Sequence, residues 1–412
     1  MVCVLRQAQG GLAVPSDVAA TLNIVAFSPN PWDGQWVNRQ QLLSRLGLRH
    51  RVVYSQGAWF TWERGLDEYR AAPWFGSFDS KEGVRVDRPP RALLRWPRLG
   101  AIDGAAVAIQ ARRLRGQRKT GDALVAYICH PMFMPYVDAL RADYVVYHCY
   151  DLYSQQPGWT AQLEADERRL LREADLIFSP TAMLSELLMQ KVPCQARVLP
   201  NAADVQAIFA ARDSGAEEPA DLARIPRPRV GYVGSIHPEL DLELIAGLAQ
   251  RQPSWHFVLI GPEQNPQRLH QTAGYKMLRA LPNIHLLGEK HRSQVPSYLL
   301  HMQANALFYK ATPGSWTHVA YPLKLHEYMA CGHPVVSVDL KMIREFEPLI
   351  RFATGVDDWE RALAQAIMGD DGTQAAQRRA IAAQHSWDAR VQVLQEWLGQ
   401  LPTLRRERLT LS

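Results

Sequence analysis

The length and composition of the chain indicate a globular protein with two domains. Its 412 residues exceed the usual size of one domain, and its 47% hydrophobic content is enough to build two cores. Five widely spaced cysteines without a CxxC pair exclude a disulfide scaffold and a zinc site, and we expect reduced thiols. No segment reaches about 18 consecutive apolar residues, which argues against a membrane span. Residues 1–20 lack the apolar core of a signal peptide, so we interpret them as a tail and expect a cytoplasmic protein.

Positive charge is concentrated in one band, Arg85 to Lys119. The chain as a whole has a formal net charge of +5, whereas this band holds ten Lys and Arg residues against Asp87 and Asp103. Its apolar residues include Leu93, Leu94, Trp96, Leu99 and Ile102. Basic and apolar side chains mixed in this way are typical of segments that bind an anionic membrane surface; the alternative is a solvated basic loop and helix. Nucleic acid is not expected as a partner, because no RNP-like, helix-turn-helix or finger pattern accompanies the charge.

Apolar runs of strand length alternate with helical patterns through residues 21–204. The runs are LNIVAF (22–27), RVVY (51–54), ALVAYIC (123–129), DYVVYHC (143–149), DLIFS (175–179) and ARVLP (196–200). Helical periodicity separates several of them, as in QWVNRQQLLSRLG (35–47). This order predicts a doubly wound parallel sheet. Residues 205–228 are rich in Ala, Asp, Glu, Arg and Pro with little apolar patterning, and we interpret them as an interdomain linker.

A second series of the same kind occupies residues 229–385. Its strand-length runs are RVGYVGSI (229–236), WHFVLIGP (255–262), NIHLLG (283–288), ANALFYK (304–310) and PVVSV (334–338). The chain is therefore expected to be an α/β protein with two Rossmann-like domains that face a cleft, followed by a C-terminal helix and tail over residues 386–412.

The stretch YPLKLHEYMACGHPVVSVD (321–339) places charged residues at the start of a short helix. Pro322 suits a first helical turn and Gly332 suits the residue after the last, which predicts a helix over about 322–331. Lys324 and Glu327 lie one turn apart near its N-terminus, where free N–H groups and the helix dipole attract anions. A phosphate site is one interpretation, and a surface ion pair between these two residues is the other.

The chain resembles GT-B nucleotide-sugar glycosyltransferases, and in particular bacterial polysaccharide transferases of the teichuronic-acid and xanthan glucuronosyltransferase type. The stretches that carry the resemblance are PWDGQWVNRQQLLSRLG, YHCYDLYSQQPGW, ADLIFSPTAMLSELL, VLPNAAD, GYVGSI and, above all, YPLKLHEYMACGHPVV. PNAAD stands where such proteins commonly have PNG-like residues.

The resemblance implies a donor site in the second domain. Lys324 would neutralise the departing diphosphate, and Glu327 matches the family glutamate that accepts hydrogen bonds from ribose hydroxyls. Gly234 and Ser235 would allow the backbone to approach the diphosphate or sugar closely. Tyr309 and Leu325 complete the expected donor-binding set. No DxD string occurs, so we expect no metal and no cofactor beyond the nucleotide-sugar itself.

One departure from the family pattern bears on the mechanism. Many retaining members carry a second glutamate eight positions before Glu327, where this chain has Val319. This favours an inverting mechanism, which needs a general base for the acceptor hydroxyl. Asp151, after the strand DYVVYHC, is the candidate that the resemblance implies, and an Asx-type turn is the alternative. His130 is a second candidate base or an acceptor contact.

The acceptor is expected to be a glycan or a lipid-linked saccharide bound by the first domain. Asp33 and Gly34, in the first βα loop, are candidate acceptor contacts, although a plain turn explains them as well. Two other functions remain open. A nucleotide-sugar epimerase of the same fold would act on the donor alone, and a binding protein without catalysis would transfer nothing.

Overall fold

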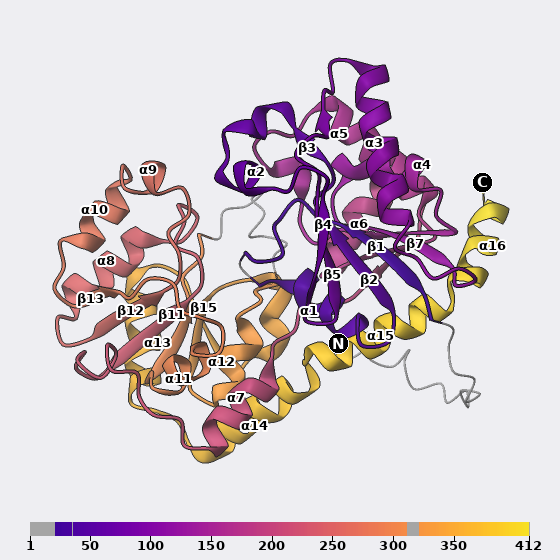
Figure 1. Ribbon diagram of the computed structural model, residues 1–412. Helices are drawn as coiled ribbons and strands as arrows, with labels where there is room; N and C mark the ends of the chain where they lie inside the picture. Colours follow the sequence, from indigo (N-terminus) through magenta and orange to yellow (C-terminus); the bar gives the residue numbers. More distant parts are fainter. Residues whose placement is uncertain (1–20, 35, 311–320, 412) are drawn as a thin grey trace.

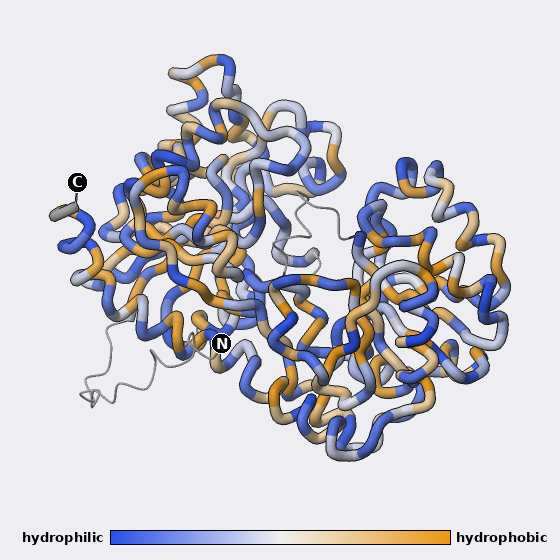
Figure 2. Tube along the Cα trace, turned by 180° about the vertical axis from the view of Figure 1, so that it is seen from behind, coloured by the Kyte–Doolittle hydropathy of each residue, from blue (hydrophilic) through white to orange (hydrophobic). Residues whose placement is uncertain are grey.

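Two α/β domains, each with its own sheet, make up the protein in the computed structural model, which describes residues 21–34, 36–310 and 321–411 (Figure 1). Every strand expected from the apolar runs is present, and both sheets are doubly wound as predicted. In the hydropathy view, hydrophobic segments run through the interior of both domains, whereas most peripheral turns are hydrophilic (Figure 2).

The N-terminal sheet has the strand order β10-β9-β8-β7-β1-β2-β5-β4. Its strands are β1 Asn23–Phe27, β2 Arg51–Ser55, β4 Ser77–Lys81, β5 Val84–Arg88, β7 Leu124–Ile128, β8 Tyr144–His148, β9 Leu176–Ser179 and β10 Ala196–Val198. The helices are α1 Asn38–Leu46, α2 Asp67–Ala71, α3 Gly100–Arg115, α4 Met134–Leu140, α5 Ala161–Glu173 and α6 Ala182–Lys191. The pairs are parallel except for the β4–β5 hairpin, and the short strands β3 Trp59–Phe60 and β6 Leu94–Arg95 pair separately.

The C-terminal sheet is parallel, in the order β13-β12-β11-β14-β15-β16. Its strands are β11 Arg229–Val233, β12 His256–Ile260, β13 Ile284–Leu286, β14 Ala304–Leu307, β15 Val335–Val338 and β16 Ile350–Ala353. The helices are α7 Val205–Asp213, α8 Leu242–Arg251, α9 Pro266–Leu269, α10 Ala273–Arg279, α11 Val295–Leu300, α12 Leu325–Cys331, α13 Val356–Ile367, α14 Gly372–Gln384, α15 Trp387–Gly399 and α16 Leu401–Leu411. The strand order reverses between β11 and β14, as it does between β1 and β7 in the first sheet.

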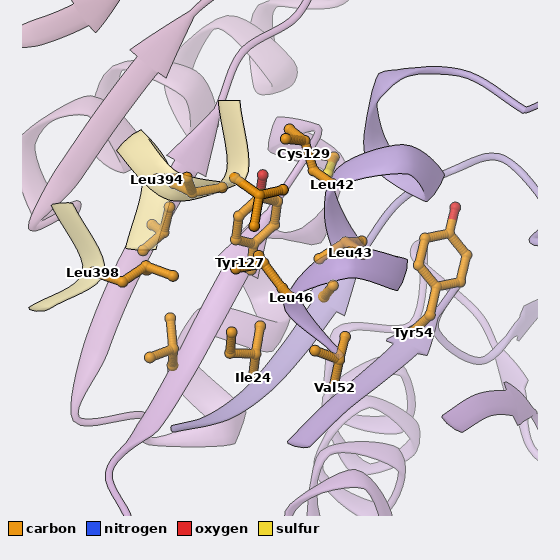
Figure 3. Close-up of a cluster of buried hydrophobic side chains, with 14 of the residues drawn as sticks. Ile24, Leu42, Leu43, Leu46, Val52, Tyr54, Tyr127, Cys129, Leu394 and Leu398 are labelled. Carbon is orange, nitrogen blue, oxygen red and sulfur yellow. The ribbon is translucent and has the colours of Figure 1, made fainter. Parts of the chain in front are cut away.

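Alternate residues of each central strand face opposite sides of the sheet, which gives each domain two apolar layers. In β1, Ile24 and Ala26 pack in one layer, and Val25 and Phe27 pack in the other. Figure 3 shows the first of these layers, in which side chains of α1 and of the C-terminal helix α15 cover the same face of the sheet. The last helices of the chain therefore complete the core of the first domain.

The segment expected to be a linker is structured instead. Residues 205–228 contain helix α7, and Val205 and Ile208 of α7 are buried in the C-terminal domain. Leu222 and Ile225 pack against residues of β12 and α11, and their region is held by the ion pair between Asp221 and Lys290. A few apolar residues spaced along this polar stretch are enough to pack it against the C-terminal domain, although their spacing does not predict a helix.

The C-terminal segment crosses back to the first domain. In Figure 1, α14 lies under the C-terminal domain, while α15 and α16, in yellow, extend along the N-terminal domain. Trp387, Leu394 and Leu398 of α15 are buried against its sheet. Within the described residues, no helix combines the length and the apolar composition that crossing a bilayer requires.

Candidate active site

Lys324 lies where the strand order of the C-terminal sheet reverses. It caps helix α12, and its Nζ donates a hydrogen bond of 2.7 Å to the hydroxyl of Tyr309, which follows β14. The ammonium lies 5.0 Å from the ring centre of Tyr232 in β11 and 5.2 Å from that of Tyr309. Burial alone would lower the pKa of Lys324, but its interactions with Tyr232 and Tyr309 raise the pKa overall. A fixed positive charge therefore occupies the switch point, where open α/β sheets bind their ligands.

Two glycines let the backbone approach this charge. Gly234, after β11, has φ +152°, and a Cβ there would lie 2.6 Å from the Nζ of Lys324. Gly261, after β12, has φ +148°, and a Cβ there would lie 2.2 Å from the carbonyl oxygen of Gly234. Neither position accepts a side chain. Ser235, the next expected donor residue, is buried, and its carbonyl accepts a hydrogen bond from the Tyr232 hydroxyl.

Glu327 occupies the first turn of α12 without pairing with Lys324. Among the described residues, its carboxylate has no hydrogen-bond partner and forms no ion pair, so the interpretation as an i,i+3 surface pair is wrong. Burial raises the pKa of Glu327 to about 7, against the opposing effect of Lys324 and with a further rise caused by Asp204. Both charged groups that the helix start presents are thus left available to a ligand.

The helix that carries these residues begins and ends close to the predicted positions. It covers Leu325–Cys331, and Gly332 follows with φ +84°, in the left-handed region that glycine favours. Leu325, expected in the donor-binding set, is fully buried in the core, and its N–H donates to the carbonyl of Pro322. Its side chain packs in the core, and its contact with the donor stays a prediction.

Asp151 lies at the carboxyl edge of the N-terminal sheet, in the loop after β8. Its Oδ1 accepts a hydrogen bond of 2.8 Å from the Leu152 N–H, and its Oδ2 accepts one of 2.6 Å from the Gln156 side chain. Burial raises the pKa of Asp151, while these bonds and the charge of Arg39 oppose the rise. The bond to Leu152 has the local geometry that the turn interpretation expects, and the raised pKa suits a general base.

His130 lies beside this loop, and its Nδ1 is occupied by a hydrogen bond from the backbone. Its Nδ1 accepts a hydrogen bond of 3.1 Å from the Met132 N–H, so the neutral ring carries its proton on Nε2. Burial lowers its pKa to about 4, with a smaller effect of Arg39, and the ring is therefore neutral at physiological pH. The ring of Tyr153, 4.6 Å away between centroids, links His130 to the Asp151 loop. Nε2–H can donate to an acceptor oxygen, and Asp151 is left as the candidate base.

Asp33 and Gly34, the predicted acceptor contacts, have partners within the N-terminal domain. Asp33 pairs with Lys81 at 2.6 Å and with Arg88 at 3.0 Å, both on the β4–β5 hairpin. Although burial opposes the change, these cations lower the pKa of Asp33 overall. The N–H of Gly34 bonds to Pro31, as in a turn. Because the hairpin was not expected from the sequence, its cations could not be foreseen as partners of Asp33.

The sequence patterns did not identify some residues at these sheet edges as candidate site residues. His237 is half-enclosed beside Tyr309, and Gly261 makes the close approach described above. The position of Gly261 directly after the strand WHFVLI could have indicated a close approach of the backbone there. Arg39, which is buried beside the Asp151 loop, lies three and four positions before Leu42 and Leu43, so the apolar face of its helix was the signal there.

Two predictions concern regions or groups that the structure does not test. Val319, on which the inverting mechanism depends, lies outside the described residues. In the part of the chain that is described, no three carboxylate, imidazole or thiol groups come together as a potential metal site.

Side chains of the two domains contact each other at several points. The guanidinium of Arg292, between β13 and α11, lies 3.7 Å over the ring of Trp36, which precedes α1. Arg292 also forms an ion pair of 3.3 Å with Glu82 of the β4–β5 turn. Asn201 accepts a hydrogen bond from Asn38 and donates one to the carbonyl of Tyr321. These contacts join the N-terminal domain to the C-terminal domain.

Comparison with known proteins agrees with this arrangement. Residues 227–369 match the family model described as glycosyl transferases group 1. A protein of Bacillus subtilis (strain 168) named for teichuronic acid biosynthesis, the glycosyltransferase TuaH, is 24% identical over 274 residues, which cover 62% of this chain and 67% of that protein.

Solved structures share the whole fold at low sequence identity. HepE of Anabaena, solved with UDP and glucose, has a TM-score of 0.64 and 15% identity, with 92% of this chain and all of that chain covered. An E. coli trehalose-6-phosphate structure bound with UDP-2-fluoro glucose has a TM-score of 0.67 and 11% identity over 92% of this chain and 99% of that chain. A UDP-forming trehalose-phosphate synthase from Burkholderia xenovorans has a TM-score of 0.63 and 14% identity, with 93% and 99% covered.

The family match lies on the domain that carries Lys324 and Glu327, and the structural match extends over both domains. The epimerase alternative gains no support from these relatives. The chain is a glycosyltransferase of the GT-B fold, and its residues 227–369 are similar to the glycosyl transferases group 1 family.

Proposed function

We propose that the protein transfers a sugar from a UDP-sugar to a hydroxyl group of a glycan or lipid-linked saccharide in the synthesis of a surface polysaccharide. The position of the Lys324 ammonium, held at Gly234 between the ends of β11 and β14, carries the proposal. Glycosyl transfer is limited by the negative charge that develops on the leaving diphosphate, and a fixed cation stabilises that charge where it appears. Support for a uridine nucleotide comes from the solved structures with UDP, and support for the pathway comes from the name of TuaH.

Glu327 is suited to bind the ribose of the donor. In its ionised form the carboxylate accepts hydrogen bonds from the two ribose hydroxyls, and no described residue competes for it. Lys324 and Glu327 lie one turn apart at the start of α12, so one nucleotide can reach both. We expect transfer without a metal ion, because Lys324 supplies the charge, and activity in EDTA tests this expectation.

In this proposal Asp151 removes the proton from the acceptor hydroxyl as that hydroxyl attacks the anomeric carbon. The attack comes from the face opposite the diphosphate, so the configuration is inverted. His130, with its proton on Nε2, would hold an acceptor oxygen. Anomeric analysis of the product by NMR checks the stereochemistry, and a product that retains the configuration of the donor would contradict the single displacement.

The first experiment measures thermal stabilisation of the full-length protein by UDP, GDP, CDP and TDP. A ligand at about 100 times its Kd stabilises by about 2.7 kcal/mol. We expect the largest shift with UDP and a loss of that shift in Lys324→Ala. Lys310→Ala is the matched control, since Lys310 lies beside Tyr309 but pairs with Glu243. Equal shifts with all nucleotides would overturn the choice of uridine, and a full UDP shift in Lys324→Ala would overturn the site.

We also propose that the protein binds an anionic membrane through the N-terminal domain. Large exposed apolar side chains gather there between residues 62 and 109: Trp62, Leu66, Trp74, Phe75, Trp96, Leu99, Ile102 and Ile109. They lie on or next to α2, β6 and α3, and Figure 1 shows these helices in the upper part of the N-terminal domain, with α2 on the side that faces the C-terminal domain and α3 on the other side. Phe75 is 90% exposed, more than any other large apolar residue of the described chain.

The basic residues near this apolar surface divide into two groups. Arg88, Arg95 and Arg113 are tied to Asp79, Asp103 and Asp87, so part of the positive band has a structural role. Arg85, Arg98, Arg112, Arg118 and Lys119 remain exposed. An anionic surface would attract these cations and accept the apolar side chains, as interfacial proteins do.

Binding to vesicles of phosphatidylglycerol and phosphatidylcholine tests this surface. We expect binding that weakens with salt and with the paired change Trp74→Ser and Phe75→Ser. The matched control is Leu48→Ser, a residue that is 83% exposed outside the patch. Binding that is unaffected by both salt and the paired change would contradict the proposal.

A further inference from the structure

Arg39 is a buried cation without a hydrogen-bond or ion-pair partner among the residues that the structure describes. Its residue is 5% exposed, and its Nε and Nη1 are enclosed without any hydrogen bond. Nη2 also has no partner among the described residues, and it is the guanidinium nitrogen that is not enclosed. One face of the group lies 4.2 Å from the ring centre of Tyr150, but a ring face does not satisfy the N–H groups at the edge of the guanidinium.

The other buried arginines of the described chain are all paired. Arg95 forms an ion pair of 2.6 Å with Asp103, and Arg378 forms one of 2.6 Å with Asp370. Arg229 pairs with Glu218. A buried arginine without an anion carries a large desolvation penalty, and the rest of this protein avoids it. The exception at Arg39 therefore points to a partner that is not part of the polypeptide.

Asp151 does not fill this role. The charge of Arg39 acts on Asp151, but no ion pair joins them, and both carboxylate oxygens are already bonded to Leu152 and Gln156. His130 and Tyr153, which also surround the region, are neutral at physiological pH because burial lowers the pKa of the imidazole and raises that of the phenol. Within the described ranges, no carboxylate on the neighbouring elements forms an ion pair with the guanidinium.

The location of Arg39 is that of a ligand site. Arg39 lies in the first turn of α1, directly after β1, and its charge is felt at Cys129 and His130, which follow β7. The strand order of the N-terminal sheet reverses between β1 and β7. The crevice outside the carboxyl ends of the strands at such a switch point is where open α/β sheets bind ligands. Lys324 occupies the corresponding place in the C-terminal sheet.

We propose that Arg39 binds an oxyanion, a carboxylate or a phosphate, of the acceptor. The planar guanidinium offers parallel N–H groups that match such an anion, and the anion would supply the partner that the fold omits. The acceptor hydroxyl would then be placed at Asp151 by an ionic anchor beside it. This inference rests on the proposed function, in which the first domain holds the acceptor, and it adds that the acceptor is charged close to the reacting hydroxyl.

Three small probes that differ in charge test the anchor. The full-length protein is titrated with D-glucose, D-glucuronate and D-glucose 6-phosphate, with and without saturating UDP, and binding is followed by saturation-transfer NMR. We expect one of the two anionic probes to bind about tenfold or more tightly than glucose, as a charge-assisted bidentate contact implies. The preferred probe distinguishes a carboxylate from a phosphate.

Substitutions show whether Arg39 is responsible. Arg39→Met should abolish the preference for the anion and leave glucose binding and UDP binding unchanged, whereas Arg39→Lys should keep a weaker preference. Arg45→Met is the matched control on the same helix, because Arg45 is already paired with Asp388 and Asp204. Should Arg39→Met fail to fold, the comparison of Arg39→Lys with wild type gives the same readout.

The outcomes separate this inference from the proposed function. Equal binding of all three probes to the wild-type protein, or an unchanged preference in Arg39→Met and Arg39→Lys, would overturn the anion site. Absence of UDP binding to the wild-type protein would overturn the donor assignment, and the comparison of probes without UDP would still decide the role of Arg39.

Discussion

The ammonium of Lys324 occupies the space that any side chain at Gly234 would need. A Cβ at Gly234 would lie 2.5 Å from the Cε and 2.6 Å from the Nζ of Lys324. The glycine and the lysine are 90 positions apart, yet they form one unit, because the strand end that carries Gly234 limits where the charge of Lys324 can lie. A change at either residue alters the position of the same positive charge.

Gly234→Ala should therefore weaken UDP binding strongly while the protein stays folded. The new methyl group displaces the lysine side chain, and φ +152° is unfavourable for alanine. We expect at least about a tenfold loss in UDP affinity, measured by isothermal titration. Gly247→Ala, in helix α8, is the control, since a Cβ at Gly247 would meet only the side chain of Val356, at 4.0 Å. Unchanged UDP affinity in Gly234→Ala would separate the glycine from the charge.

Glu327 should make the stability of the protein depend on pH. Its pKa is about 7 in the folded protein, raised by burial from the ordinary value of 4.5. Between these values the folded state binds more protons than the unfolded state, so stability falls as pH rises through this window. Glu327→Gln removes the titration and should be relatively more stable at pH 8 than at pH 5, by on the order of 1–2 kcal/mol after allowance for partial exposure. Thermal unfolding of both proteins at the two pH values measures the difference, which would be equal at both if the pKa were normal.

Asp151→Asn should abolish sugar transfer without affecting the donor site. The amide has the same shape but cannot take the proton of the acceptor hydroxyl, and loss of a general base commonly costs about 10² to 10⁴ in rate. Transfer is measured alongside UDP affinity, which should stay at the wild-type value. Near-normal turnover would remove Asp151 from the catalytic role.

Gln156→Leu should move the acidic limb of the pH–rate profile to higher pH. The Gln156 side chain donates a hydrogen bond of 2.6 Å to Asp151, and this bond lowers the pKa of the carboxylate. Its removal favours the protonated acid, so more alkaline conditions are needed to form the base. Rates of transfer over a range of pH show the displacement. A profile identical to that of the wild type would mean that another group controls the acidic limb.

Leu394→Ala should destabilise the N-terminal domain although the residue lies near the end of the chain. Leu394 is fully buried against the sheet of that domain, and a Leu→Ala change in a core costs about 2–5 kcal/mol. Chemical denaturation measures this loss. Leu48→Ala, at a residue that is 83% exposed, is the control and should change stability by less than about 0.5 kcal/mol. A small effect of Leu394→Ala would show that α15 adds little to the first core.

The strands and the helix of the donor site were predictable from the sequence because their signals are local. The run Val335, Val336 and Val338 is apolar without interruption, as in a strand covered on both faces, and Gly332 ends the preceding helix at the expected residue. The partners of these side chains were not predictable. The bond from Lys324 to Tyr309 depends on the order of β11 and β14 in the sheet, which no pattern within one segment specifies.

The partners of polar residues in loops were the least predictable, because they depend on neighbours distant in sequence. For Asp33, whose contact with the acceptor stays a prediction, the hairpin β4–β5 supplies the partners Lys81 and Arg88. That hairpin contains polar residues at most positions, so no apolar run in the sequence predicts its strands. Conversely, Arg39 carries a charge on the apolar face of a predicted helix, and only the structure shows that no described residue forms a hydrogen bond or ion pair with it.

The two passages of the chain between the domains lie side by side, and this limits how the domains can move. Ala203, on the outgoing passage, pairs with Ser386 on the returning one: the Ala203 N–H bonds to the His385 carbonyl at 3.0 Å, and the Trp387 N–H bonds to the Ala203 carbonyl at 3.3 Å. Because these two segments are hydrogen-bonded to each other, we expect them to act as one hinge between the domains. The domains can swing about it, which would open or close the contact of Arg292 with Trp36, but they cannot readily slide past each other. Amide hydrogen exchange should accordingly show Ala203 and Trp387 protected with and without UDP, whereas loss of their protection on binding would mean that the two passages separate during closure.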